Sequence, residues 1–143
     1  MTPRVRRVVQ AVLYEACAIA FVAPTLSWLF GRAPLDALGL ALTLSAIALS
    51  WNYVFNLLFE RWEARQVVKG RSWWRRLVHG AGFEGGLSCI LVPVMALWLN
   101  ISLWQALVAN LGILLFFLCY TVAFTWCFDR VFGLPQAARA AAP

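Results

Sequence analysis

The sequence predicts an all-α membrane protein, with four transmembrane helices arranged as two tandem parallel-repeat helical hairpins. The first observation is composition: hydrophobic residues make up 63% of the 143 residues and charged residues only 13%, about half the charged share of a typical soluble domain. The second is that four apolar segments each reach the roughly 20 residues needed to cross a bilayer. The third is that the second half of the chain repeats the first.

The four expected spans are separated by short or polar segments. The first and third connections, residues 31–34 and 100–102, are so short that they must join antiparallel neighbouring helices. The middle segment, residues 60–75, is polar and basic, and we expect it to be helical at its start. The spans themselves are expected over residues 7–30, 35–59, 77–99 and 103–128.

Basic residues lie almost entirely at one end of the expected spans. Of the 12 lysines and arginines, Arg32 alone falls on the side of the two short connections. Because cytoplasmic segments carry the excess of basic residues in multi-pass membrane proteins, we expect both termini in the cytoplasm. The basic residues on that side are Arg4, Arg6, Arg7, Arg61, Arg65, Lys69, Arg71, Arg75, Arg76, Arg130 and Arg139.

The net charge of +6 does not indicate nucleic-acid binding. The basic residues flank apolar runs instead of forming a solvated face, so the expected partner is the lipid bilayer and not nucleic acid. The cysteines lie inside apolar runs without the spacing of metal ligands, so we expect buried small side chains and neither a metal nor a cofactor. They are Cys17, Cys89, Cys119 and Cys127.

An offset of 69 residues superimposes the two halves of the chain without a gap. Apolar runs aligned by chance would not match acidic residues and prolines in one frame, so we expect two repeats, residues 1–66 and residues 67–143. Each repeat holds two spans, and both repeats therefore enter the membrane in the same direction. The matched prolines are expected to bend their helices, and a gating role is left open. The matched pairs include Tyr14 with Phe83, Glu15 with Glu84, Pro24 with Pro93, Trp51 with Tyr120, and Glu60 with Asp129.

Glu15 and Glu84 are the strongest functional signal. Each lies nine residues beyond an arginine, or about 13 Å along a helix, close to the middle of a bilayer core of about 30 Å. An ionisable side chain there is costly and usually marks a pathway for ions or substrates. The alternative is a protonated glutamic acid that bonds a neighbouring helix. For Glu84, the Gly82-xxx-Gly86 spacing leaves a role in a close helix interface open.

A polar stripe follows the second helix of each repeat. Asn52, Asn56 and Glu60 recur every four residues and share one face, and Thr121, Thr125 and Asp129 take the equivalent places. Counting along an antiparallel hairpin places Asn52 near the depth of Glu15. We therefore expect Asn52 and Asn56 to line a binding chamber with that carboxylate.

The same counting predicts charge pairs at the cytoplasmic ends of the hairpins. It places Arg7 level with Glu60, and Arg76 level with Asp129. We expect both pairs to be structural.

Aromatic residues surround the expected chamber. Trp51, Tyr14 and Tyr120 are candidates to contact an organic cation through their ring faces, although ordinary helix packing would use them as well. Near the ends of the spans, further tryptophans are expected to anchor the protein at the membrane surfaces. These are Trp28, Trp62, Trp73, Trp74, Trp98 and Trp104.

These residue types predict transport and not catalysis. A carboxyl group away from water favours its protonated form, and a cation bound beside it favours the charged form. A proton and a cation would therefore compete for one carboxylate, which is the minimal chemistry of antiport. No nucleophile–base set is visible in the sequence, so we do not expect an enzyme.

Four motifs together carry a family resemblance that covers residues 6–129. With these motifs, the chain resembles the proteobacterial antimicrobial compound efflux family, which is built from two bacterial transmembrane pair domains. The first two motifs are Arg7 through Tyr14-Glu15, and Trp51-Asn52-x-x-Phe55-Asn56-x-x-Phe59-Glu60. The second repeat supplies Arg76-x-x-His79-x-x-x-Phe83-Glu84-Gly85-Gly86 and Tyr120-x-x-x-Phe124-x-Trp126-x-x-Asp129.

The resemblance implies a proton-coupled multidrug exporter of the bacterial inner membrane that contributes to antimicrobial resistance. Family substrates include biocides such as chlorhexidine, dyes such as acriflavine, and short-chain diamines such as cadaverine and putrescine. The first-helix glutamate of the family, here Glu15, is linked to protonation and substrate binding. The chain departs from the family at Gln10, where relatives often have histidine.

The sequence thus predicts an antiporter that exchanges protons for small, mostly cationic organic compounds. Glu15 would be the principal carboxylate and Glu84 a second protonatable group, and a homodimer would complete the pathway. Two alternatives stay open: a membrane scaffold that uses the glutamates only as hydrogen-bonding groups, and a passive cation channel.

Overall fold

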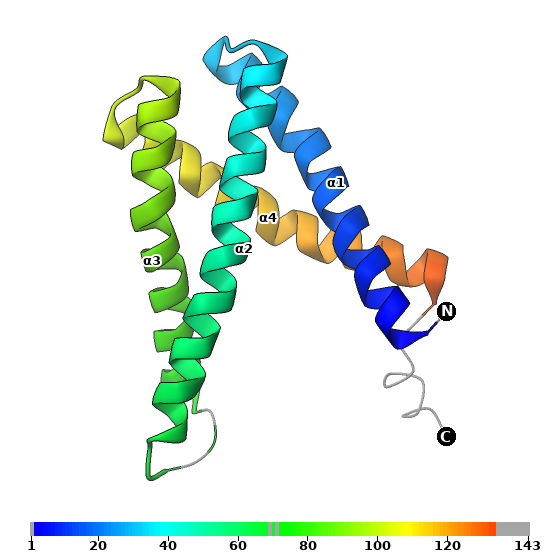
Figure 1. The fold of residues 1–143 in the computed structure, drawn as a ribbon, viewed down its shortest axis with the longest axis vertical. Helices are drawn as coiled ribbons and strands as arrows, with labels where there is room; N and C mark the ends of the chain where they lie inside the picture. The colour runs from blue at the N-terminus through cyan, green and yellow to red at the C-terminus, as the bar shows by residue number, and fades with distance from the viewer. Residues whose placement is uncertain (1, 69, 71, 134–143) are drawn as a thin grey trace.

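The computed structural model describes residues 2–68, 70 and 72–133. Within these ranges the chain is all-α, and each of its four helices is long and apolar enough to cross a membrane (Figure 1). The four predicted helices are therefore confirmed. They are α1 (Pro3–Phe30), α2 (Pro34–Ala64), α3 (Trp73–Leu99) and α4 (Leu103–Phe132).

Local capping chemistry sets where the helices begin and end. Ser102 and Gln105 form a capping box at the start of α4, in which each side chain accepts a hydrogen bond from the other's backbone N–H. Ser72 caps α3 by accepting from the N–H of Arg75. The C-terminal end of α1 is capped by Gly31. Its φ of 60° is the left-handed conformation that glycine adopts readily.

The two ends of the molecule differ, and we name them by their chain segments. Residues 31–33 and 100–102 join the helices at the connector end. The start of α1 and the end of α4 lie together at the opposite end (Figure 1), where Arg6 donates to the Gly133 carbonyl, and we call this the terminal end. The predicted spans match the helices within one residue at the connector end. At the terminal end the helices continue four or more residues further, because a helix does not stop where polar residues begin. The sequence also leads us to expect a short, partly disordered tail after Asp129. The structure continues α4 to Phe132, and residues 134–143 lie outside the described residues.

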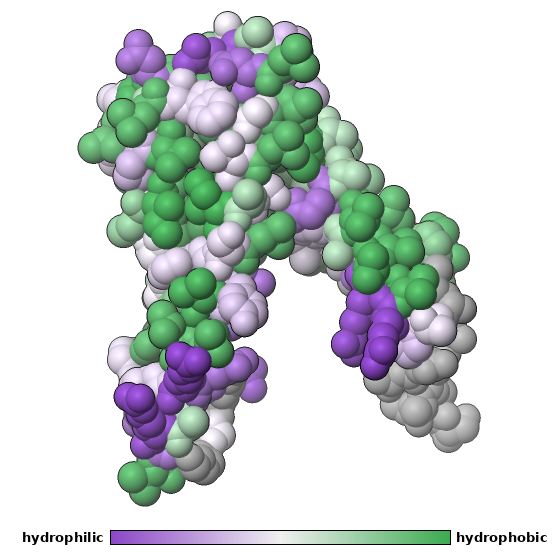
Figure 2. Space-filling view, in the orientation of Figure 1, coloured by the Kyte–Doolittle hydropathy of each residue, from purple (hydrophilic) through white to green (hydrophobic). Residues whose placement is uncertain are grey.

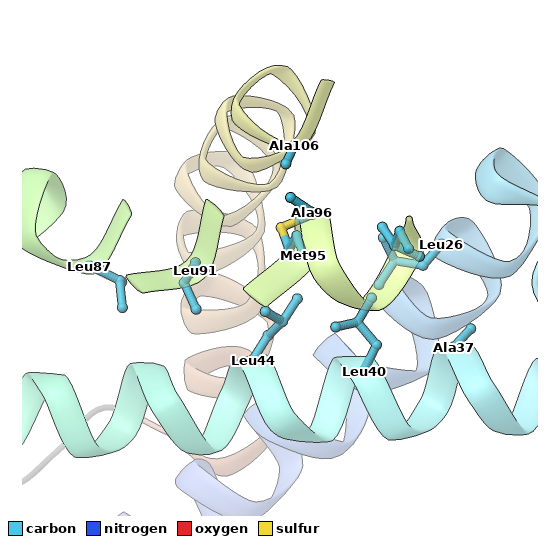
Figure 3. Close-up of a cluster of buried hydrophobic side chains, with 10 residues drawn as sticks. Leu26, Ala37, Leu40, Leu44, Leu87, Leu91, Met95, Ala96 and Ala106 are labelled. Atoms are coloured by element: carbon cyan, nitrogen blue, oxygen red, sulfur yellow. The ribbon is translucent and has the colours of Figure 1, made fainter. Parts of the chain in front are cut away.

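The connector end is closed by a single hydrophobic core to which all four helices contribute (Figure 3). Leu40 of α2 and Met95 of α3 are completely buried at its centre. Leu26 of α1 and Ala106 of α4 complete the contact between the two hairpins. The full cluster is Leu26, Ala37, Leu40, Leu44, Leu87, Leu91, Met95, Ala96, Leu99 and Ala106.

A polar cluster beside this core joins the first connection to α3. Trp98 Nε1 donates to Asp36 Oδ1 at 3.1 Å, and Arg32 both faces Asp36 Oδ2 at 3.6 Å and donates to the Trp98 carbonyl. The one basic residue on this side of the spans is thus partnered. Trp98 is half-buried and bonded to Asp36, so it contacts its own protein more closely than an anchor at the membrane surface requires, and its anchoring stays a prediction.

At the terminal end the helices separate into two pairs, α2 with α3 and α1 with α4 (Figure 1). Figure 2 shows these pairs as two legs with an open wedge between them. Each hairpin therefore exchanges partners along its length: neighbours in sequence pack at the connector end, and helices of different repeats pack at the terminal end.

Most of the apolar surface faces outward, as expected for a protein surrounded by lipid. Five tryptophans predicted as anchors are exposed: Trp28, Trp62, Trp73, Trp74 and Trp104.

The cysteines lie on the same outer surface. All four are free and exposed, so the prediction that they are buried is wrong. The four are Cys17, Cys89, Cys119 and Cys127.

Candidate functional site

Glu15 lies midway along α1 and is half-buried. Its Oε2 accepts a hydrogen bond of 2.5 Å from Ser45 Oγ of α2. This contact marks the point where the first hairpin divides. Beyond it toward the terminal end, the hydrogen bonds and ring contacts between helices link α1 to α4 and α2 to α3.

The structure does not bring Asn52 or Asn56 into hydrogen-bond contact with Glu15. Asn52 lies seven residues beyond Ser45, or about 10 Å further along α2. Its Oδ1 accepts from Asn56 Nδ2 at 2.7 Å, and Asn56 Oδ1 lies 2.8 Å from His79 Nε2 of α3. Counting from Glu60 misplaced these residues because α1 and α2 diverge over this stretch.

Two equivalent hydrogen bonds join the repeats at this level. Trp51 Nε1 of α2 donates to the Phe83 carbonyl of α3 at 2.9 Å. Tyr120 Oη of α4 donates to the Tyr14 carbonyl of α1 at 2.8 Å. In each case an aromatic residue of one repeat reaches the residue immediately before the glutamate of the other repeat. Equivalent positions of the two repeats therefore make equivalent hydrogen bonds.

The rings beside these bonds repeat the same geometry. Phe55 meets Phe83 edge-on with ring centroids 5.6 Å apart, and its counterpart Phe124 meets Tyr14 edge-on at 5.3 Å. One turn further, Phe55 stacks on Phe59 at 5.9 Å, just as Phe124 stacks on Phe128 at 5.9 Å. Edge-on pairs of this kind stabilise beyond the area they bury. Both legs of the molecule thus use one aromatic pattern.

Tyr14 has a second contact that its counterpart lacks. Its hydroxyl lies 2.8 Å from Thr121 Oγ1 of α4, whereas Phe83 has no hydroxyl. Tyr120 and Trp51 thus bond the residues that precede the two glutamates, and Tyr14 is one of those residues. All three aromatic residues pack in the inter-repeat contacts.

Two of the glycines around Glu84 seat aromatic rings of α2. A Cβ at Gly86 would collide with the Trp51 ring, whose Cη2 would lie at 2.9 Å, and a Cβ at Gly82 would lie 3.3 Å from Phe55 Cζ. The predicted close contact at the Gly82-xxx-Gly86 spacing therefore exists, with rings as its partners.

Glu84 itself lies away from that interface. Two residues along a helix amount to about 200° of rotation, so Glu84 projects from the side opposite Gly82. Its side chain is half-buried and makes no hydrogen bond or salt bridge with any described residue. Among the described residues, Glu15 therefore has a polar partner and Glu84 has none.

The charge pairs at the terminal end differ from those predicted. Asp129 Oδ1 bonds Arg6 Nη2 at 2.6 Å, and not Arg76. Over the residues that the structure describes, the exposed Glu60 takes part in no salt bridge with Arg7 or any other residue. The prediction was wrong because it paired helices within one hairpin, whereas α4 packs on α1 of the other repeat at this end.

Sequence reasoning missed two polar partners inside the spans. Ser45 precedes Asn52 by seven residues and continues the polar stripe of α2 by two turns, which was the available signal. Asn110 of α4 is 3% exposed and donates to Ser88 Oγ of α3 at 2.9 Å. A lone asparagine in an apolar span is a comparable signal for an interhelical hydrogen bond.

One carboxylate inside the spans thus has a polar partner on another helix. Glu15 accepts from the Ser45 hydroxyl of α2, and the rings of Tyr14 and Tyr120 contact each other beside its turn of α1. No group of three metal-ligating side chains occurs among the described residues.

The sequence profile of the chlorhexidine efflux transporter family matches the chain twice, over residues 2–65 and residues 71–134. The chain belongs to this family. The transporter therefore consists of two tandem family repeats, and the resemblance to the proteobacterial antimicrobial compound efflux family is confirmed.

Curated relatives of the transporter are similar along almost their full length. A short-chain diamines transporter of Vibrio parahaemolyticus is 38% identical over 128 residues, 90% of this chain and 91% of its own. A short-chain diamines transporter of Acinetobacter baylyi is 36% identical over 127 residues, 88% of this chain and 89% of its own. No solved structure matches the chain. The protein is therefore a multi-pass membrane transporter of small compounds and not an enzyme.

Proposed function

We propose that the transporter exchanges protons for small organic cations across the bacterial inner membrane, with Glu15 as the group that binds one or the other. The observation that carries this proposal is the contact of Glu15 with Ser45 at the head of the wedge. A carboxylate at mid-membrane costs several kcal/mol unless it is partnered or hydrated. One hydroxyl donor leaves most of its acceptor capacity free for a proton or a cation.

The shape of the molecule fits one state of an alternating-access cycle. With both termini in the cytoplasm, the wedge opens to the cytoplasm, and the connector end is closed by the core and by the Arg32–Asp36–Trp98 cluster. A cation would reach Glu15 from the cytoplasmic side and expel its proton. Export then requires the connector end to open.

The substrate class follows from the carboxylate and from the relatives. The curated relatives are named for short-chain diamines, and the family for chlorhexidine; both are cations near neutral pH. Asn52 and Asn56 would contact the substrate lower in the wedge. Glu84 would be a second protonatable group, and a homodimer would enclose the pathway.

A liposome assay tests the proposal. Protein reconstituted in liposomes under an imposed pH gradient should accumulate radiolabelled putrescine against its concentration gradient. Glu15→Gln keeps the shape of the side chain and removes its titration, so gradient-driven accumulation should fall to background. Glu60→Gln, at an exposed acid of the same hairpin, is the matched control and should retain accumulation.

Three results would oppose the proposal in different ways. Accumulation that persists in Glu15→Gln would remove this carboxylate from the coupling. Flux in wild type that never exceeds equilibrium would indicate a channel. No flux of putrescine, cadaverine or chlorhexidine in wild type would favour the scaffold.

A further inference from the structure

A groove of about 690 Å³ runs between α1 and α4 in the connector half of the molecule. Its wall is almost entirely apolar, and its volume lies within the range of small-molecule sites. Residues that define it include Phe21, Leu26, Trp104, Gly112 and Phe116.

The groove lies on the face of α1 that also carries Glu15. Val22, on its wall, follows Glu15 by seven residues, so the two lie on one face of α1 about 10 Å apart. Aromatic rings bridge this interval on α4. Phe116 faces Phe21 at 6.2 Å and stacks on Tyr120 at 5.3 Å.

The last ring of this series lies beside the carboxylate-bearing turn. Tyr120 contacts Tyr14, the residue before Glu15, with centroids 4.9 Å apart. A path of ring faces thus leads from an apolar groove to a carboxylate. That combination recognises a molecule with a cationic group at one end and an apolar or aromatic group at the other.

At the connector end, the corresponding space between α2 and α3 is filled by side chains of the protein. There Leu40 and Leu44 are buried in the core. Their counterparts in the second repeat, Ala109 and Ile113, line the groove instead. The α2–α3 interface is therefore packed at the connector end and keeps only a smaller hollow of about 480 Å³ further along, between Thr43, Trp51 and Ile90. The larger groove between α1 and α4 extends to the connector end.

We propose that the α1–α4 groove binds the apolar part of an amphipathic organic cation whose charged group lies at Glu15. This inference rests on the proposed function and extends it: the groove sets which large cations are accepted. A short diamine has no apolar group to place there and needs only the carboxylate. The groove would therefore matter for chlorhexidine and not for putrescine.

Gly112 offers a direct test, because a side chain there enters the groove without a clash. A Cβ at Gly112 meets nothing within 4 Å, and the same holds for Gly80 on α3, outside the groove. Gly112→Leu and Gly80→Leu are thus matched in chemistry and differ in place. Size-exclusion profiles and helical circular dichroism would establish that both variants are folded.

The measurements are chlorhexidine binding in detergent by calorimetry and gradient-driven transport of chlorhexidine and putrescine in liposomes. Gly112→Leu should weaken binding and transport of chlorhexidine roughly tenfold or more, the scale of one blocked apolar subsite. Putrescine transport should stay within about twofold of wild type. Gly80→Leu should leave both substrates unchanged.

Other results would contradict either the proposal that the groove binds the cation or the proposal of proton antiport, and they distinguish the two. Unchanged chlorhexidine binding in Gly112→Leu would mean that lipid occupies the groove. An equal loss for both substrates with an altered oligomeric state would mean that a second copy of the chain packs there. If wild type binds chlorhexidine, Gly112→Leu does not, and neither substrate follows the pH gradient, then the groove stands and the proton coupling falls.

Discussion

The two inter-repeat interfaces, α2 with α3 and α1 with α4, are alike in one half and unlike in the other. In the terminal half each has the same aromatic bond to a carbonyl and the same edge-on ring pair. In the connector half, α2 and α3 share a buried core, whereas α1 and α4 leave a groove. Equivalent positions of the two repeats thus carry aromatic residues with the same contacts in the terminal half. In the connector half they carry side chains of different size, and the two interfaces pack differently.

Differences at single equivalent positions of the two repeats explain why α2 and α3 pack closely at the connector end and α1 and α4 do not. Trp98 of α3 packs on Gly39 of α2, where an added Cβ would lie 3.3 Å from its ring, and donates to Asp36. In the other interface the counterpart of Trp98 is Leu29, and the counterpart of Gly39 is Val108. A leucine is shorter than a tryptophan and carries no hydrogen-bond donor. A valine side chain occupies the space that a ring fills above a glycine.

The two glutamates also differ in their surroundings, although they occupy equivalent positions in the repeats. Replacing each of them by glutamine gives the largest expected effect. Ser45 meets Glu15, whereas the counterpart of Ser45 in the second repeat is Leu114. Glu15→Gln should abolish gradient-driven putrescine transport, and Glu84→Gln should leave a measurable rate. Equal losses in the liposome assay would show that the two repeats contribute equally despite their different partners.

The next largest effect concerns the seat of Trp51. Gly86→Ala places a methyl group against the indole and should destabilise the protein by about 1–3 kcal/mol, the cost of overpacking. Gly85→Ala, where a Cβ meets nothing within 4 Å, is the control and should leave the melting temperature in detergent unchanged. Equal melting temperatures for the two variants would contradict the close contact between α2 and α3.

The two equivalent hydrogen bonds should have similar strengths. Tyr120→Phe and Trp51→Phe each remove one donor to a backbone carbonyl, and each should cost about 0.5–1.5 kcal/mol of stability, with some added loss of ring contact for the tryptophan. Thermal unfolding followed by circular dichroism measures both. A cost for one variant and none for the other would mean that the symmetry of these bonds is geometric only.

The smallest effect is expected at the connector end. Asp36→Asn keeps an acceptor for Trp98 and weakens the attraction of Arg32, and partly exposed ion pairs are worth at most about 1 kcal/mol. The melting temperature should fall slightly, and less so at high salt. A change of several degrees would indicate that Arg32–Asp36 contributes more to closure than its exposure suggests.

The positions of the helices and of one candidate functional carboxylate could be predicted from local patterns in the sequence. The spans were predicted within a residue at the connector end, because glycine, proline and serine mark those turns. Glu15 was identified because a carboxylate within an apolar run stands out by itself. The polar stripe of α2 also follows from the sequence, but the member of it that bonds Glu15 is Ser45, two turns before the predicted Asn52.

The failures share a cause. Arg76 was paired with Asp129, and Asn52 with Glu15, on the assumption that hairpin neighbours stay neighbours along their whole length. In the structure α1 leaves α2 beyond Ser45 and packs on α4, so Asp129 meets Arg6 instead. Depth along a helix follows from the sequence, but the partner at that depth depends on helix tilt.

The sequence by itself determined the membrane environment, the four helices, the repeat and the placement of a carboxylate at mid-span. These properties depend on hydropathy and on spacing along one chain, which are local. Only the tertiary structure decided that Glu15 meets Ser45, that the legs exchange partners, and that a groove remains between α1 and α4. These depend on the angles at which helices cross and on the sizes of side chains that meet across the interface, and neither is encoded in the order of residues along a single helix.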